Sequence, residues 1–208
     1  AGWFNSAGDA LAVDTNYLDA GWNTDIDVSS TGAPHIVFTQ QLADSTGKSS
    51  LANLDAAVAS ASPATVSYVT TVTGGWTSAP DVVSNDYDIR DLDIELDTQD
   101  VVHVVWISAN NGVFYRQKMG TSWQTTKDVQ NLTDAGNLNE GNLDMKDLVL
   151  SNGDEMLGLA VGYATSDCAY VEYAWKETNE QTFTRSFLVE SFDGYDKMPE
   201  VALALYND

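Results

Sequence analysis

The segment DIELDTQDVVHVVW, residues 93–106, decides the fold. It aligns without a gap with DIDVSSTGAPHIVF, residues 25–38, so that acidic residues match acidic ones and apolar residues match apolar ones. A third copy, DLVLSNGDEMLGLAV, begins at Asp147, and a fourth, EVALALYND, begins at Glu200. Similarity at a fixed period is typical of repeat architectures, in which one structural unit recurs along the chain.

Each full unit contains four short segments with strand character, separated by turn residues. The second segment is apolar at nearly every position, as a strand covered on both faces requires. A unit of about 50 residues with four strands has the length of a propeller blade. We therefore predict an all-β fold of β-propeller blades, each with four antiparallel strands. The expected strands are 25–30, 34–39, 65–72 and 76–83, then 89–97, 101–108, 112–119 and 123–130, then 145–151, 156–164, 168–176 and 182–190.

The repeats predict three complete blades and a partial blade at each end. The complete blades are expected at 25–84, 88–132 and 142–191, and the partial ones at 1–20 and 198–208. These parts do not close a ring, and an open ring leaves unpaired sheet edges. Residues 1–208 are therefore one propeller domain completed by another chain, or a fragment of a larger propeller. A closed four-bladed ring is the third alternative, but the middle strands of its fourth blade are not visible in the sequence.

The order of the elements resembles a known family. An apolar strand, a Gly/Asn/Asp turn, a His-Val-Val-Trp strand at 103–106, a Tyr-bearing strand and a Trp-led outer strand are similar to the sialidase-like, BNR-type propeller repeats of many extracellular proteins. The Asp-box of that family, Ser-x-Asp-x-Gly-x-Thr-Trp, is not intact, because 29–32 and 151–154 are degenerate turns. The resemblance implies a propeller fold and a secreted, extracellular protein. It implies no activity, since this architecture carries many unrelated functions.

The charge of the chain restricts its partners. Asp and Glu number 31 and Lys and Arg number 9, which gives a formal net charge of −22 at neutral pH. Such a field repels phosphate backbones and anionic lipid headgroups. No apolar run approaches the length of a membrane span. We therefore expect neither nucleic acid nor membrane insertion, and the acidity fits cations, neutral or cationic ligands, or a saline habitat.

No catalytic constellation is visible. His35 and His103 occupy the same position in two repeats, and a catalytic residue is normally needed once, so we expect a structural role with a bond to the backbone of the blade. No G-x-S-x-G nucleophile elbow is present. Sialidases hold a substrate carboxylate with several arginines, and of Arg90, Arg116 and Arg185 only Arg90 falls at the start of an inner strand. A self-contained sialidase site is therefore not expected.

One acidic connection between blades suggests a metal site. Asn137, Asn139, Asn142 and Asp144 follow one another with the spacing N-x-N-x-x-N-x-D. Converging oxygen donors of this kind suit Ca²⁺. The segment is not an EF-hand, because it lacks the terminal Glu and the flanking helices. The alternative is a set of hydrated turn residues, since Asp and Asn tolerate turn conformations.

One tryptophan does not follow the repeat. Trp22 lies in the acidic segment 19–23, where a loop between blades is expected, and an exposed indole can stack on a sugar ring. The other tryptophans occupy repeat-equivalent places, which packing between blades explains. We name Trp22, Asp19, Asp88 and Arg90 as candidate ligand-binding residues.

These observations favour a non-catalytic extracellular binding or assembly module, which presents an acidic propeller face to carbohydrate or protein. One form of this hypothesis adds a bound calcium ion. One alternative is a fragment of a propeller-based carbohydrate-active enzyme, a glycoside hydrolase or a polysaccharide lyase. Another is a structural subunit of an extracellular filament or virion, in which neighbouring chains close the open edges. The expected protein partners are further copies in a homo-oligomer or the remaining part of the same propeller.

Overall fold

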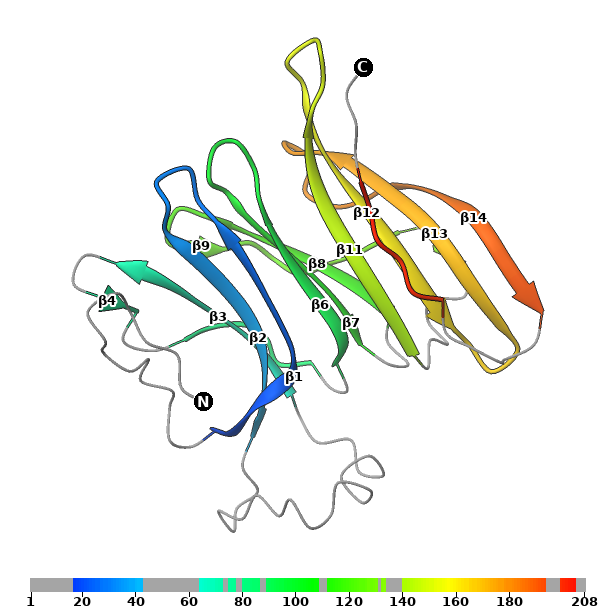
Figure 1. Cartoon of the computed structure of the whole chain (residues 1–208), viewed down its shortest axis with the longest axis horizontal. Coiled ribbons are helices and arrows are strands. Elements are labelled where there is room, and N and C mark those ends of the chain that lie inside the picture. Colours follow the sequence, from blue (N-terminus) through cyan, green and yellow to red (C-terminus); the bar gives the residue numbers. More distant parts are fainter. Residues whose placement is uncertain are drawn as a thin grey trace. The chain divides into compact units, whose positions relative to one another are not determined.

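The computed structural model describes residues 17–42, 64–72, 75–77, 80–86, 89–108, 112–130, 132–133, 140–193 and 199–204. These residues form β-strands and turns, and they include no helix, which confirms the all-β class. The chain divides into two compact units, residues 1–88 and residues 89–208, and each is described by itself. The three antiparallel sheets in Figure 1 correspond to the three predicted repeats.

The first unit holds the first sheet, with strand order β1-β2-β3 and two short strands on the far side of β3. A turn between β1 and β2 places Gly32 at a φ of 81°, a conformation that glycine adopts without steric cost. Ile36, Phe38 and Val69 form a buried cluster on this sheet. The strands are β1 (Tyr17–Val28), β2 (Pro34–Leu42), β3 (Ala64–Val72), β4 (Gly75–Trp76) and β5 (Asp81–Ser84).

The second unit holds the other two sheets. β7 is buried at every position, as the sequence predicted for a strand covered on both faces. The second sheet consists of β6 (Ile89–Leu96), β7 (Val102–Ser108) and β8 (Gly112–Met119), with β9 (Ser122–Trp123) and β10 (Lys127–Asp128) both paired to β8. The third sheet runs in the order β11 (Glu140–Val149), β12 (Glu155–Ala164), β13 (Cys168–Glu177) and β14 (Arg185–Asp193).

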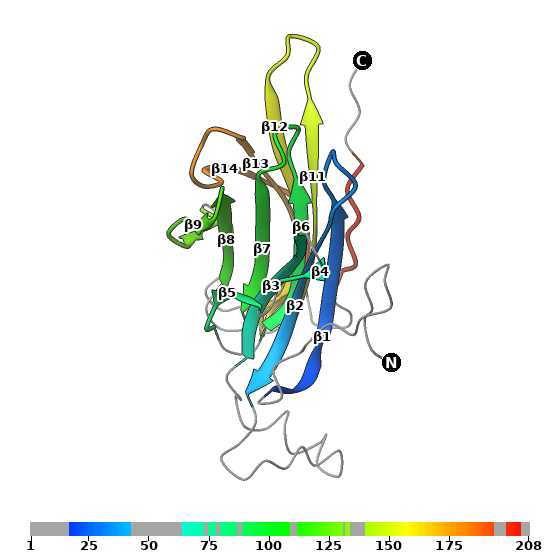
Figure 2. The same cartoon turned by 90° about the vertical axis from the view of Figure 1, so that its left-hand side faces the viewer.

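The second and third sheets pack face to face. Figure 1 shows β11 alongside β6, and Figure 2 shows the same neighbourhood from the side. Val105 and Tyr115 of the second sheet share one buried core with Leu157, Leu159 and Phe183 of the third. Because side chains alternate between the faces of a strand, the neighbours of Leu157 and Leu159 on β12 point to the opposite side. We call that side the outer face of the third sheet.

Two features differ from the sequence prediction. The outer strands expected at 76–83 and 123–130 are each broken into two short pieces. In the first case the break precedes β5 at Pro80, which has no N–H for the ladder. In addition, β1 and β11 begin earlier than expected, because β2 and β12 are long enough to keep pairing, as far as Tyr17 with Leu42 and Glu140 with Ala164.

Candidate functional site

The three sheets begin with the same hairpin turn, which makes their positions comparable. In each sheet a backbone N–H after the first strand donates to the carbonyl oxygen four residues later. Two residues beyond the acceptor stand His35, His103 and Met156, so these side chains occupy corresponding positions. The donor and acceptor residues are Ser29 and Ala33 (2.9 Å), Asp97 and Val101 (3.2 Å), and Leu150 and Asp154 (2.7 Å).

Two of these positions carry the same histidine–tyrosine pair. His35 Nδ1 lies 2.7 Å from the Tyr68 hydroxyl, and His103 Nδ1 lies 2.6 Å from the Tyr115 hydroxyl. Burial raises the pKa of Tyr68 to about 12 and raises the pKa of Tyr115 as well, so both hydroxyls stay protonated at neutral pH. Each histidine thus bonds a tyrosine side chain of the neighbouring strand, where a backbone partner was expected.

His103 also meets a carboxylate. Its Nε2 lies 3.3 Å from Asp97 Oδ2, and the Tyr115 hydroxyl donates to Gln117 Oε1 at 2.8 Å. Burial lowers the pKa of His103, and nearby Lys176 lowers it further, against the opposing effect of Asp97. Burial tends to raise the pKa of Asp97, but hydrogen bonds from His103 and from backbone N–H groups bring it below its usual value. The His103 side chain has no exposed surface, so a substrate cannot reach this cluster as it stands.

A lysine from the third sheet fills the space in front of Tyr115. Lys176 is fully buried, and its Nζ lies 4.9 Å from the centroid of the Tyr115 ring, within the range of a cation–π contact. The ammonium donates to the carbonyl oxygens of Glu177 (3.2 Å), Thr178 (3.3 Å) and Glu180 (2.9 Å). Burial lowers the pKa of Lys176 to about 8, so the group remains mostly charged at neutral pH.

The third sheet has an open counterpart of this site on its outer face. Met156 pairs with Glu177 across β12 and β13 as His103 pairs with Gln117 across β7 and β8. One step further, Trp175 takes the place of Tyr115. A pocket of about 290 Å³ lies here, which we call the Trp175 pocket. It is lined by Leu150, Asp154, Glu155, Met156, Trp175, Glu177 and Arg185.

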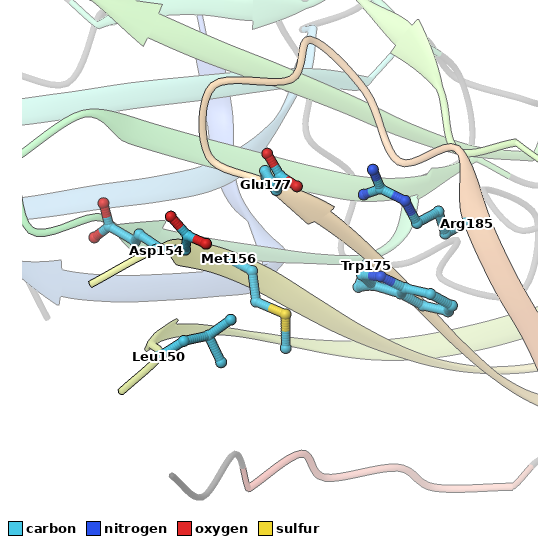
Figure 3. A pocket seen from close by; sticks show the side chains of 7 residues that line it. Leu150, Asp154, Met156, Trp175, Glu177 and Arg185 are labelled. Carbon is cyan, nitrogen blue, oxygen red and sulfur yellow. The ribbon is translucent and has the colours of Figure 1, made fainter. Parts of the chain in front are cut away.

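Figure 3 shows Trp175, Glu177 and Arg185 on one side of this pocket and Leu150, Asp154 and Met156 on the other. The Trp175 ring stacks on Tyr173 at 5.9 Å between centroids and meets Phe187, which is 52% exposed, at 6.0 Å. The three rings therefore form an aromatic surface that continues beyond the pocket.

The pocket is electronegative. Asp154 and Glu177 contribute two carboxylates and Arg185 contributes one guanidinium. The Glu155 carboxylate is directed to the second sheet, where its Oε1 accepts the N–H of Thr98 at 2.6 Å. The Arg185 charge is already paired, because Nη1 and Nη2 donate to the two oxygens of Glu180 at 2.7 and 2.8 Å. Among the residues that the structure describes, none donates a hydrogen bond to the Glu177 carboxylate. A ligand with donors or positive charge therefore finds acceptors here.

Other carboxylates of the second unit accept hydrogen bonds from the backbone of a neighbouring sheet. On β6, Asp91, Asp93 and Glu95 accept backbone N–H groups of β11 from the next sheet. The bonds join Asp91 Oδ2 to Leu143 N (2.9 Å), Asp93 Oδ2 to Met145 N (2.6 Å) and Glu95 Oε1 to Asp147 N (3.0 Å), each across an interval of 52 residues. We call this arrangement the acceptor ladder. It attaches the first strand of one sheet to the first strand of the next.

The ladder continues at the C-terminal segment 199–204. Asn142 accepts the N–H of Val201 at 2.9 Å and donates to the carbonyl oxygen of Pro199 at 2.6 Å. Asp144 accepts the N–H of Leu203 at 2.6 Å, so both intervals are 59 residues. The red segment in Figure 1 therefore runs alongside β11. The partial blade predicted at 198–208 stays a prediction.

The residues predicted from sequence fall in several places. Asp19 and Trp22 lie on β1 and not in a loop, and Arg90 lies on β6 with an exposed side chain. Asn142 and Asp144 lie on β11, again not in a loop, and bond backbone groups. Asp88, Asn137 and Asn139 lie outside the described residues. The ligand set and the calcium site stay predictions.

Sequence reasoning missed the Trp175 pocket, because Trp175 was assigned to packing between blades. A signal was present in the repeated pair of an aromatic and a basic residue, Tyr115-Arg116 and Trp175-Lys176. In the part of the chain that the structure covers, no group of three or more His, Cys, Asp or Glu side chains is arranged to hold a metal ion. None of the described residues forms a helix long and apolar enough to cross a membrane.

Comparison with known proteins assigns no family. No protein-family model matches the chain, and no curated protein matches it. A fucose lectin from Kordia zhangzhouensis in complex with methyl-fucoside has a TM-score of 0.42 and 11% identity, over 77% of this chain and 96% of that one. A triple mutant of AofleA from Arthrobotrys oligospora has a TM-score of 0.45 and 10% identity, over 81% of this chain and 43% of that one. The polysaccharide lyase Uly1 has a TM-score of 0.40 and 13% identity, over 86% and 48%.

The chain therefore spans nearly all of the first of these structures and less than half of the other two. At these scores the likeness carries no argument about activity or ligand.

Proposed function

We propose that the protein is a non-catalytic module that binds carbohydrate at the Trp175 pocket. The observation that carries the proposal is the pocket itself, in which an indole ring and acceptor side chains meet on an outer face. A sugar ring offers an apolar face for stacking and hydroxyl groups for hydrogen bonds, and sites with this mixture of groups are typical of small-molecule binding. Glu177 and Asp154 supply acceptors beside the Trp175 ring.

Binding without turnover fits the state of the imidazoles. The chain has two histidines, and His103 is sealed between Asp97 and Tyr115. His35 is half-buried, and its Nδ1 bonds the Tyr68 hydroxyl. The enzyme alternative, a glycoside hydrolase or a polysaccharide lyase, has no comparable observation in its favour among the described residues.

The proposal includes the propeller arrangement. The shared core and the acceptor ladder support the second and third sheets as successive blades. The recurring hairpin turn supports the same blade structure for the first sheet. We also expect, as parts of the same proposal, a secreted, extracellular location and a bound calcium ion.

Assembly is a second candidate function, and the segment 199–204 favours it. This segment bonds to Asn142 and Asp144 as the first strand of a further sheet would. Strands from a second copy, or from the remaining part of the same propeller, would complete that sheet.

The test is glycan binding by the purified chain and by Trp175→Ala, measured on a glycan array and by titration calorimetry. Loss of a stacking ring is expected to weaken binding by about tenfold or more. Trp123→Ala is the matched control, because Trp123 is a half-buried tryptophan of the second sheet outside the pocket. Equal affinity of Trp175→Ala and the parent chain would remove the pocket from the binding site.

A further inference from the structure

The second sheet shows what its version of the Trp175 pocket holds. The space in front of Tyr115 contains the alkylammonium group of Lys176, at 4.9 Å from the ring centroid. This lysine brings its own acceptors, since three carbonyl oxygens of the segment that follows it take its hydrogen bonds. The receiving side of the second sheet offers neutral groups, Gln117 and the Tyr115 ring, together with the bound pair of His103 and Asp97.

The third sheet changes the receiving side at each corresponding position. Trp175 replaces Tyr115, and tryptophan is the best aromatic partner for a cation. Glu177 replaces the neutral Gln117 and adds a negative charge. Met156 replaces His103 and brings no hydrogen-bond donor and no positive charge. All three changes favour a positively charged occupant.

A second carboxylate strengthens this preference. Asp154 lines the same pocket, whereas the Glu155 carboxylate is directed to the second sheet, where its Oε1 accepts the N–H of Thr98 at 2.6 Å. The cation Arg185 is held by Glu180 and is therefore balanced. The formal charge of −22 on the whole chain attracts cations at longer range.

We infer that the Trp175 pocket binds a primary ammonium group, and that its carbohydrate ligand is a polymer of amino sugars with free amines, such as a glucosamine oligomer. The inference rests on the carbohydrate-binding function proposed above and adds the chemical class of the ligand. A volume of about 290 Å³ is at the low end for small-molecule sites. The pocket therefore suits one sugar residue of a longer chain, with Tyr173 and Phe187 available for the next residue.

The alternative occupant with a primary ammonium group is a lysine side chain from a further sheet. The second sheet argues against it, because its lysine donates hydrogen bonds to three carbonyl oxygens of its own segment and to no carboxylate of the receiving side. The Trp175 pocket supplies the carboxylates of Asp154 and Glu177 itself. That composition suits an amine that arrives without acceptors, as the amine of a sugar does.

The experiment titrates the full chain with short glucosamine oligomers, with the same oligomers after N-acetylation, and with glucose oligomers, at mildly acidic pH where the amines are protonated. We expect the free-amine oligomer to bind about tenfold more tightly than the N-acetylated one, with an affinity that falls as salt is added. Glu177→Gln restores the residue of the second sheet. It is expected to weaken binding of the free-amine oligomer by about tenfold and to weaken binding of the N-acetylated oligomer by clearly less, because that oligomer loses only a stronger acceptor and no ion pair.

Glu190→Gln is the matched control, because it removes the same charge from an exposed position of β14 outside the pocket. Asp154→Asn serves as a second pocket variant if Glu177→Gln folds poorly. Equal affinity for free-amine and N-acetylated oligomers would overturn the inference and leave the proposed function standing. Binding of none of the oligomers would overturn both. Tighter binding of a lysine-rich peptide than of the glucosamine oligomer would make the occupant a protein and overturn the amino-sugar assignment.

Discussion

Asp93 gives the sharpest test of the acceptor ladder. Its Oδ2 accepts the backbone N–H of Met145 at 2.6 Å, and both residues are buried, with exposed fractions of 6% and 0%. Asp93→Ala removes this acceptor without touching the backbone pairing within either sheet. The Met145 N–H is then left between the two sheets without its partner.

The expected loss follows from that geometry. A buried donor that loses its partner costs about 1–3 kcal/mol, and a bond to a charged acceptor is stronger than a neutral one. We therefore expect Asp93→Ala to lower the free energy of unfolding by about 2 kcal/mol. Asp93→Asn keeps an oxygen at nearly the same place, so its loss should be about half as large or less.

Urea unfolding at neutral pH, followed by tryptophan fluorescence and far-UV circular dichroism, measures these differences. Asp167→Ala is the control, because Asp167 is an exposed acidic residue in the turn before β13 and should change stability by less than about 0.5 kcal/mol. If Asp93→Ala costs no more than Asp167→Ala, the ladder does not hold the sheets together. If the Ala and Asn variants lose the same free energy of unfolding, the oxygen retained in the Asn variant does not contribute to stability.

Two other predictions concern the same unit. Burial and the nearby Glu155 raise the pKa of Asp147 from 3.8 to about 7. The folded protein therefore favours the protonated carboxyl, and the free energy of unfolding falls as pH rises between these two values. Asp147→Asn should be more stable than the parent at neutral pH and show no such gain near pH 3.8 in unfolding titrations. At Gly162 an added Cβ would lie 2.5 Å from the Pro199 carbonyl oxygen and 3.0 Å from Val201 Cγ1. Gly162→Ala should displace the segment 199–204 and speed hydrogen exchange at Val201 and Leu203, whereas exchange unchanged from the parent would show that this segment does not lie over β12.

The repeat could be predicted from sequence because buried strands carry a dense signal. The strands expected at 101–108 and 168–176 agree closely with β7 (Val102–Ser108) and β13 (Cys168–Glu177). Both strands are apolar at most positions, and the hairpin turns beside them contain residues that favour turns. Local composition is enough to find such elements.

The early parts of β1 and β11 could not be predicted in the same way. Asn142 and Asp144 look like residues of a hydrated loop, and their spacing suggested calcium ligands. In the structure they are strand residues whose side chains bond the backbone of the segment 199–204. An acidic residue that bonds a neighbouring sheet and one that lies in a turn have the same sequence pattern, because the partner is far away along the chain.

The Trp175 pocket was hidden for a related reason. Tyr115 and Trp175 hold the same place in successive sheets, and the repeat alone predicts the same packing for both. The difference lies in what faces them: Lys176 and Phe183 cover Tyr115, whereas a pocket lies beside Trp175. A sequence shows which residue is aromatic but not which aromatic residue is covered.

The indole N–H signal of Trp175 gives the most direct test of the central claim, which is that carbohydrate binds at the Trp175 pocket. The six tryptophans of the chain provide the internal comparison in a nuclear magnetic resonance titration with a glucosamine oligomer. We expect the Trp175 signal, assigned through its loss in Trp175→Ala, to shift in proportion to saturation while the Trp106 signal, from a fully buried ring, stays in place. A saturating shift confined to other tryptophans, with Trp175 unmoved, would exclude the Trp175 pocket as the binding site.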